Sequence, residues 1–180
     1  MELYFFRHGD AEPVRPGGPD GERQLSERGR DDVQAVARAL SRAGVQPQAI
    51  FTSPLLRAGQ TGQILAEQLA AGEGSSAALL IAAEPVKGLG PGCRLGDVQA
   101  LLADRALDRV MLVGHEPDMS MIVGDLVGGM SVRLQTSAVA RVDAGSIEPG
   151  EGVLVWLLTP ALAQPGQAGD PHDLRRRPSA

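Results

Sequence analysis

Short apolar runs alternate along this chain with longer segments of helical period, and this alternation constrains the fold most. The runs are rich in Val, Ile, Leu or Phe and lie at residues 3–6, 50–52, 79–83, 110–113, 138–142 and 153–158. Strands that alternate with helices are typical of a largely parallel sheet covered on both faces. We therefore expect an α/β fold with three layers, α/β/α. A Gly/Pro turn separates the last two runs, which could form a hairpin.

The segments between the runs predict four helices. Ser26 is a suitable N-cap for a long helix that stops at Gly44. Ser53 and Pro54 read as the N-cap and first residue of a second helix, which puts Arg57 in its first or second turn. Shorter helices are expected at about residues 97–103 and 118–127. A Gly/Ser linker at residues 72–76 and an irregular stretch at 85–95 separate these elements.

Length and patterning indicate one domain. A domain of 180 residues can bury roughly 70% of its unfolded surface, so no disulfide or metal is needed to stabilise it. We assign the domain to residues 1–160. From Pro160 onward we expect a disordered tail, with residues 161–180 outside the domain. The chain contains no internal repeat.

Charge and cysteine content exclude several classes of partner. The net charge is −5, and the short basic run Arg175–Arg177 is not the clustered basic face that nucleic-acid binding requires. No apolar run approaches the roughly 18 residues of a membrane span. A single cysteine, Cys93, cannot form an intramolecular disulfide, and the N-terminus lacks a basic segment followed by an apolar stretch. We therefore expect a cytoplasmic protein that binds neither nucleic acid nor membrane.

Histidine and arginine follow three of the expected strands. Arg7, His8 and Gly9 come after the first, Ser53 and Arg57 after the second, and Gly114 and His115 after the run at 110–113. In open α/β sheets, ligands bind beyond the carboxyl ends of the strands, where helix N-termini also favour anions. These residues therefore predict an anion site. The third histidine, His172, lies in the expected tail.

These three blocks resemble a known family. Arg7-His8-Gly9, the segment 53–61 (SPLLRAGQT) and the segment 114–117 (GHEP) are similar to the motifs of the histidine phosphatases, also called the phosphoglycerate mutase-like superfamily. The likeness runs from about residue 1 to 160. Asp10-Ala11 and the stretch 136–138 look most like its SixA-type phosphohistidine phosphatase branch. The resemblance implies a phosphoglycerate mutase-like fold and a catalytic, phosphate-binding set of His8, Arg7, Arg57 and His115, with no metal or cofactor.

Phosphoryl transfer explains why these residue types are required. It needs an in-line nucleophile and positive groups around the equatorial oxygens, so catalysis is mostly positioning and electrostatics. His8 must be neutral to attack, and two neighbouring guanidiniums should lower its pKa. By resemblance, a phosphorylated His8 forms and water hydrolyses it. We expect the substrate to be phosphohistidine on a histidine-phosphotransfer or signalling protein. A small phosphorylated metabolite and a non-catalytic phosphate-binding module are the alternatives.

The general acid for the leaving group is not defined by the sequence. Many members of the superfamily take it from a carboxylate in the segment that here is 84–88, but no acid stands in register. Four carboxylates nearby remain candidates: Glu84, Glu116, Asp118 and Asp10. Phosphohistidine leaves as imidazole and needs less protonation than an alkoxide, so a missing acid favours a phosphoramidate substrate.

Other phosphate chemistries fit the sequence poorly. A cysteine phosphatase would carry arginine six residues after its nucleophile, where Gln99 follows Cys93, and the only lysine, Lys87, is not part of a P-loop. A zinc site built from His8, His115, Cys93 and Asp10 lacks recognisable ligand spacing. Arg23 could reach a substrate phosphate or remain a solvated loop charge, and Ser137 could line the site or a strand edge.

Overall fold

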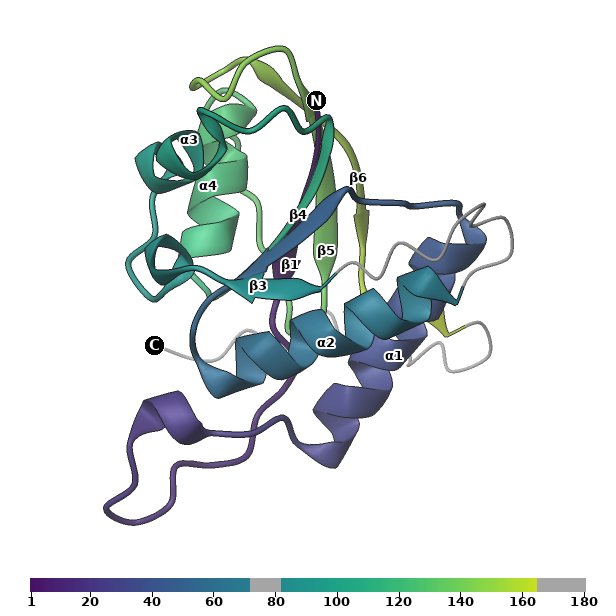
Figure 1. Cartoon of the computed structure of the whole chain (residues 1–180), viewed down its shortest axis with the longest axis vertical. Coiled ribbons are helices and arrows are strands. Elements are labelled where there is room, and N and C mark those ends of the chain that lie inside the picture. The colour runs from purple at the N-terminus through teal and green to yellow at the C-terminus, as the bar shows by residue number, and fades with distance from the viewer. Residues whose placement is uncertain (72–81, 165–180) are drawn as a thin grey trace.

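The computed structural model of the protein describes residues 1–71 and 82–164, which form one six-stranded sheet and its flanking helices (Figure 1). The strands are β1 (Glu2–Arg7), β2 (Ala49–Thr52), β3 (Ala83–Pro85), β4 (Arg109–Gly114), β5 (Val139–Ala144) and β6 (Gly152–Leu158). The α-helices are α1 (Glu27–Arg42), α2 (Leu56–Ala70), α3 (Leu95–Leu102), α4 (Asp118–Leu126) and α5 (Pro160–Ala163). Two short 3-10 helices, η1 (Asp20–Glu22) and η2 (Lys87–Leu89), lie in the connections.

The sheet is mostly parallel, as predicted. Its strand order is β3-β2-β4-β1-β5-β6. The pairs β3/β2, β2/β4 and β4/β1 are parallel, whereas β5 runs antiparallel to both β1 and β6. The expected hairpin of the last two apolar runs is therefore also confirmed. The four parallel neighbours present their carboxyl ends at one edge of the sheet.

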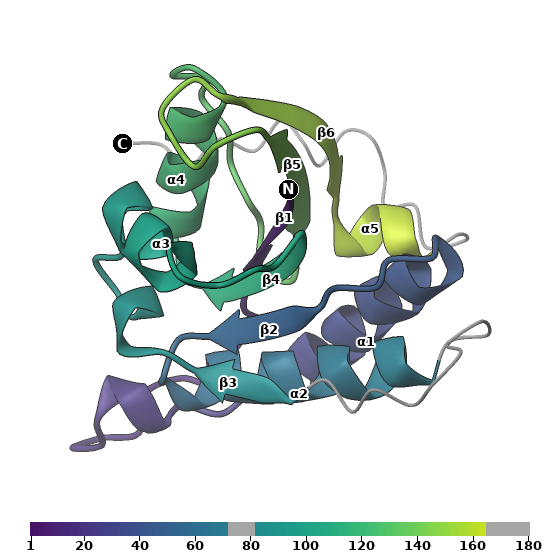
Figure 2. The same ribbon diagram turned by 45° about the horizontal axis from the view of Figure 1, so that its top comes forward.

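Helices cover both faces of the sheet and complete the three layers (Figure 2). Helices α1 and α2 lie on one face and α3 and α4 on the other. Strand β1 serves both cores, because Leu3 and Phe5 pack with the α3/α4 side while Tyr4 and Phe6 pack with the α1/α2 side. Burial on both faces explains why β1, β2 and β4 read as continuous apolar runs. No helix within residues 1–71 and 82–164 is long and apolar enough to cross a membrane.

Helix α1 begins and ends at the residues that the sequence indicated. The Ser26 hydroxyl accepts a hydrogen bond from the Gly29 amide, which satisfies one of the free N–H groups of the first turn. The chain leaves the helix through Gly44, whose φ of +73° lies in the left-handed region. The Ser26 cap fixes where the long loop after β1 ends and α1 begins.

The start of α2 was predicted incorrectly. Ser53 is not its N-cap and Pro54 is not its first residue, because the helix begins at Leu56 and Leu55 occupies the cap position. The Ser53 hydroxyl instead accepts from the Leu55 amide at 3.2 Å and contacts His115. A side chain engaged with a neighbouring strand end cannot also cap the helix.

Two further predictions were shifted or wrong. The third strand is Ala83–Pro85 rather than 79–83, of which residues 79–81 lie outside the described part. Disorder from Pro160 is contradicted for residues 160–164, since α5 forms there and buries Ala163 in the core beside α1. The linker at 72–76 and residues 165–180 lie outside the described residues.

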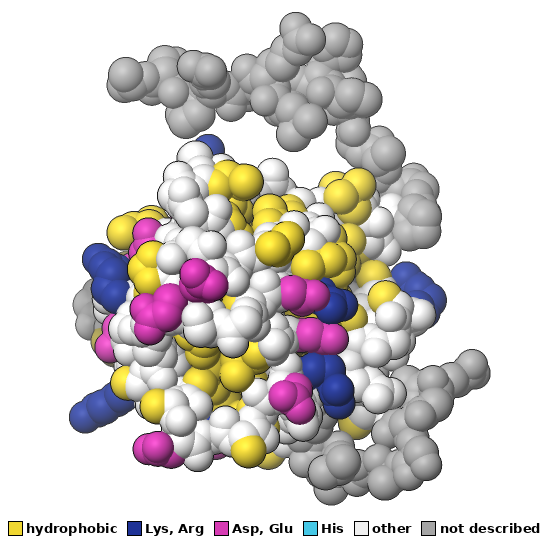
Figure 3. Space-filling model, turned by 90° about the horizontal axis from the view of Figure 1, so that it is seen from above, with side chains coloured by type: hydrophobic (Ala, Val, Ile, Leu, Met, Phe, Trp, Pro, Cys, Tyr) yellow, Lys and Arg dark blue, Asp and Glu magenta, His cyan; other side chains and the backbone are white. Residues whose placement is uncertain are grey.

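The face at which β1 begins carries charges of both signs (Figure 3). Lys and Arg side chains lie among Asp and Glu side chains and apolar patches, and no histidine is visible from this side. The strand-end histidines lie at the other end of the parallel strands. This view therefore separates the mixed-charge end of the sheet from the end that holds the site.

Gly29 is expected to be intolerant of substitution, because its helix is pressed against the segment after β1. A Cβ at this position would lie 2.8 Å from the Asp10 backbone nitrogen and would contact the Asp10 carbonyl oxygen even more closely. Gly29→Ala should lower the free energy of unfolding by about 1–3 kcal/mol through overpacking. Gly59 in α2 is the matched control, since a Cβ added there would meet nothing within 4 Å. Gly59→Ala should leave stability unchanged or raise it by up to about 1 kcal/mol, and urea denaturation of both variants measures the difference.

Candidate active site

The parallel register brings the three sequence blocks together at one edge of the sheet. Arg7 pairs with Gly114 in the last register position of β1 and β4. Beyond the strands, the His8 amide donates to the Gly114 carbonyl at 3.0 Å, and the Ser53 amide donates to the Val113 carbonyl at 2.8 Å. The three strand ends are thus joined by backbone hydrogen bonds before any side chain contributes.

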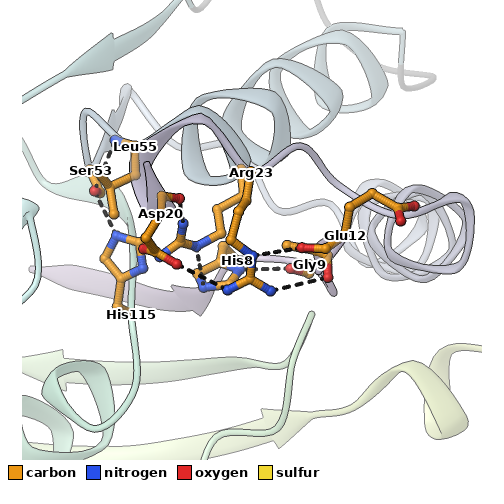
Figure 4. A network of polar contacts seen from close by, with 10 residues as sticks. His8, Gly9, Glu12, Asp20, Arg23, Ser53, Leu55 and His115 are labelled. Carbon is orange, nitrogen blue, oxygen red and sulfur yellow. Dashed lines mark hydrogen bonds and ion pairs between the residues drawn. The ribbon is translucent and has the colours of Figure 1, made fainter. Parts of the chain in front are cut away.

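The two histidines lie in contact. The rings of His8 and His115 have centroids 4.9 Å apart and meet edge to face at 61° (Figure 4). His115 is only 5% exposed. The sequence prediction that these two side chains share one site is therefore consistent with the geometry.

Backbone contact fixes the tautomer of His8. Its Nδ1 lies 2.6 Å from the Gly9 carbonyl oxygen, which can only accept, so Nδ1 carries the proton. In the neutral ring the lone pair is then on Nε2. Arg57 Nε donates to this Nε2 at 3.2 Å. The nitrogen available for nucleophilic attack is therefore Nε2, and it faces a guanidinium.

Arg57 is buried in the first turn of α2, where it is 6% exposed. Its Nη1 donates to the Asp20 carbonyl and its Nη2 to Asp20 Oδ2, both at 2.9 Å. One turn later, the Thr61 hydroxyl donates to the Arg57 carbonyl at 2.8 Å and accepts from the Gly9 amide at 3.1 Å. Helix α2 therefore positions both Arg57 and the segment that contains His8.

Arg7 reaches the site from the end of β1 and is anchored by the chain before β5. Its Nη1 donates to the Leu134 carbonyl at 2.9 Å. The Leu134 amide in turn donates to the Ser120 hydroxyl on α4 at 2.9 Å. Arg7 is thereby held by the opposite helical layer from the one that holds Arg57, so the two guanidiniums approach from different sides.

Ser53 binds the second histidine. Its Oγ lies 2.7 Å from His115 Nε2, which leaves Nδ1 on the other side of the ring without a hydrogen-bond partner. Two more buried side-chain atoms among residues 1–71 and 82–164 also lack partners, namely Arg7 Nε and Ser137 Oγ. The Ser137 amide donates to the His8 carbonyl at 3.2 Å. Two of the three unpaired polar atoms therefore belong to candidate site residues, and the third belongs to Ser137, which hydrogen-bonds the His8 backbone.

Burial keeps both histidines neutral. It lowers the pKa of His8 to about 4, with smaller contributions from His115, Arg57 and Arg7, while the hydrogen bond to Gly9 opposes the shift. Burial also lowers the pKa of His115 to about 4, followed by the charge of Arg57. The predicted direction for His8 agrees, but removal from water contributes more than the guanidiniums do. Burial likewise lowers the pKa of Arg7.

Asp20 was not among the residues that the sequence singled out. Its carboxylate accepts from Arg57 at 2.9 Å and from Arg23 Nη1 at 3.1 Å, and these two guanidiniums lower its pKa. Arg23 also donates to the carbonyls of Ala11 and Glu12, so its charge is engaged within the loop. A single Asp in a polar loop matches no sequence motif. Only the folded structure shows that Asp20 lies against Arg57 of α2.

The four candidate acids are placed differently. Asp10 accepts from the Ser26 hydroxyl at 2.8 Å, and Asp118 accepts from Arg94 and from the Gly92 amide, so both carboxylates hold loops in place. Glu84 is exposed on β3. Glu116 accepts from Ser120 at 2.8 Å, and its charge favours the protonated form of Arg7. Among the described residues, none of the four forms a hydrogen bond with either histidine.

The alternative zinc ligands do not come together. Within the described ranges, no group of three or more His, Cys, Asp or Glu side chains could hold a metal ion. Cys93 is buried, and burial raises the pKa of its thiol to about 12. A thiol held in its protonated form is a poor metal ligand.

Three comparisons with known proteins agree with this picture. Residues 3–75 match the family described as histidine phosphatase superfamily (branch 1). An uncharacterized Picosynechococcus protein is 40% identical over 122 residues, 66% of this chain and 68% of that protein. The phosphohistidine phosphatase SixA of Escherichia coli is 29% identical over 164 residues, 89% of this chain and 94% of that protein. A structure of the protein histidine phosphatase SixA complexed with tungstate superposes with a TM-score of 0.77 at 27% identity, over 91% of this chain and all of that one.

The fold and site define a three-layer α/β protein with paired histidines and arginines at the carboxyl ends of its parallel strands. The chain belongs to the histidine phosphatase superfamily and falls in its SixA-type branch.

The depressed pKa of His8 predicts how stability depends on pH. The folded protein keeps His8 neutral down to about pH 4, whereas the unfolded chain binds a proton below the ordinary value of about 6.5. Stability should therefore be greatest above pH 6.5 and fall as the pH is lowered from 6.5 to 4. His8→Gln removes this contribution and should show a shallower fall in urea denaturation across that range. His115, whose pKa is also lowered to about 4, and the carboxylates titrate in both proteins, so coinciding pH curves would show that the pKa of His8 is not depressed.

Proposed function

We propose that this protein is a metal-independent phosphatase that hydrolyses phosphohistidine on a signalling or carrier protein through a phosphorylated His8. The observation that carries the proposal is the state of His8: a half-buried, neutral imidazole whose proton is on Nδ1 and whose unprotonated Nε2 accepts a hydrogen bond from Arg57. Attack on phosphorus requires that this hydrogen bond shift from Nε2 to a phosphoryl oxygen. An imidazole in that state is a competent nucleophile near neutral pH. The substrate class is suggested by the Escherichia coli relative, a phosphohistidine phosphatase.

Arg7, Arg57 and His115 are proposed to bind the phosphoryl group. Two guanidiniums held in different layers can contact different equatorial oxygens, and Arg binds such oxygens in a forked geometry. The unpaired Arg7 Nε and His115 Nδ1 are buried polar atoms, and leaving such atoms unmatched is unfavourable by about 1–3 kcal/mol each. A bound tetrahedral anion would satisfy them. Its negative charge would also favour the protonated form of His115.

The reaction follows from this geometry in two steps. Nε2 of His8 forms a bond to phosphorus while the bond from phosphorus to the leaving nitrogen breaks. The proton remains on Nδ1 of His8, where it is hydrogen-bonded to the Gly9 carbonyl. The phosphorylated ring is therefore cationic and becomes a good leaving group itself. Water then attacks phosphorus, and the electron pair of the P–N bond returns to Nε2. In both steps the arginines compensate the charge of the equatorial oxygens.

The covalent intermediate provides the direct test. Brief incubation with a histidine-phosphotransfer domain carrying ³²P on its histidine, followed by an alkaline quench, should leave acid-labile label on the wild-type protein. His8→Ala should carry none and should not release phosphate, because no other described imidazole accepts a hydrogen bond from Arg57. Label retained on His8→Ala would exclude His8 as the nucleophile.

Chelation tests the proposed independence from metal. Two guanidiniums supply the charge compensation that a cation provides in many phosphatases. Phosphate release should therefore be unchanged after dialysis against EDTA, measured side by side with an untreated sample. A loss of activity that added zinc or magnesium restores would instead assign the charge compensation to a cation.

A further inference from the structure

Asp20 is the carboxylate that hydrogen bonds connect to His8, the proposed nucleophile. The proposed mechanism assigns it no role. It is linked to His8 through one guanidinium, since Arg57 donates from Nε to His8 and from Nη2 to Asp20. Figure 4 shows the Asp20 side chain among His8, His115 and Arg23. Its charge also favours the protonated form of His115, as expected for a carboxylate near that ring.

Asp20 differs from the rest of the site in being accessible. Its side chain is 54% exposed, whereas Arg57 and His115 are almost completely buried. Attack by His8 is in line, so the leaving group departs on the side of phosphorus away from Nε2. The buried residues close the inner side of the site, and the leaving group has to emerge on the solvent side. The exposed Asp20 carboxylate is therefore accessible to a leaving group that departs toward solvent.

The carboxylate can accept further hydrogen bonds but has no proton to donate. An ionised carboxylate offers about four acceptor positions, and the described contacts from Arg23 and Arg57 occupy one on each oxygen. Those two guanidiniums also keep the pKa of Asp20 low, so it is ionised near neutral pH. An ionised acid cannot protonate an alkoxide leaving group. It can stabilise a leaving group that already carries a proton.

We propose that Asp20 selects for a nitrogen leaving group by accepting a hydrogen bond from the ring N–H of the substrate phosphohistidine. This inference rests on the proposed function and assigns its leaving-group specificity. The carboxylate favours the protonated, cationic form of the phosphorylated ring over the neutral form. A leaving group that already carries its proton does not need the general acid that phosphate esters require.

The step is balanced without an added proton. The substrate ring carries phosphorus on one nitrogen and hydrogen on the other, which faces Asp20. As the bond from His8 Nε2 to phosphorus forms, the P–N bond breaks and its electron pair stays on the ring. The departing group is neutral imidazole with its N–H already in place. A phosphate ester has no such N–H, and its oxygen would leave as an anion beside a carboxylate.

Asp20→Asn tests the proposal with two substrates whose leaving groups differ: one carries a ring N–H and the other carries none. One is the phosphorylated histidine-phosphotransfer domain, and the other is p-nitrophenyl phosphate, whose phenolate leaves without a proton. A hydrogen bond to a charged group contributes about 1.5–3 kcal/mol, so kcat/KM for phosphohistidine should fall by on the order of 10- to 100-fold relative to kcat/KM for the aryl ester. Asp20→Glu keeps the charge and should restore part of the preference.

Glu22→Gln is the matched control. Glu22 lies in the same 3-10 turn, is exposed, and loses the same charge on substitution, but its side chain makes no described contact with Arg57. Its ratio of phosphohistidine to aryl ester activity should equal that of the wild type. Equal losses on both substrates in Asp20→Asn leave the ratio unchanged and would overturn the proposal, since Asp20 would then only position Arg57. Aryl ester turnover shows that each variant is folded. A wild-type protein that cleaves the aryl ester but not phosphohistidine would refute the proposed substrate as well.

Discussion

The site depends first on the parallel alignment of β1, β4 and β2. Hydrogen bonds from His8 to Gly114 and from Ser53 to Val113 tie three strand ends together with backbone groups alone. These backbone hydrogen bonds restrict the directions of the side chains at the strand ends. The ring centroids of His8 and His115, 107 positions apart in the chain, therefore lie 4.9 Å from each other. Each of the two cores then anchors one arginine, Arg57 from α2 and Arg7 through Leu134. The sheet therefore functions as the rigid base on which the charges are arranged.

Burial and charge act together on His8, the proposed nucleophile. Removal from water is the largest cause of the low pKa of His8, and the positive neighbours act in the same direction. A more exposed histidine with the same neighbours would have a larger protonated fraction near neutral pH and would be a poorer nucleophile. The hydrogen bond from Nδ1 to Gly9 then decides which nitrogen is free. The site obtains a neutral nucleophile and a positive phosphate pocket at once because the positive charge resides on arginines, which stay ionised when partly buried.

Most of the fold was accessible from sequence because its signals are local. Strand runs, the Ser26 cap and the strand-end motifs each depend on a few adjacent residues, and the resemblance to the family added the roles of His8, Arg7, Arg57 and His115. The errors have a different origin. Ser53 has the chemistry of a helix cap, but its oxygen is engaged by His115 across the sheet. Pro160 looked like the start of a tail, but Ala163 finds space in the core beside α1. Asp20 gains its place only when η1 is folded against α2. Each error concerns a contact between distant segments that no local pattern encodes.

The distribution of carboxylates at the site bears on which phosphorylated groups can leave. Asp10 and Asp118 are committed to loop hydrogen bonds, and Asp20 is held ionised by two arginines. An ionised Asp20 accepts hydrogen bonds and has no proton to donate near neutral pH. A site of this kind is poorly suited to alkyl phosphate esters, because an alkoxide needs a proton as it departs. It suits a leaving group that brings its own proton. In phosphohistidine, the proposed substrate, the second ring nitrogen already carries that proton.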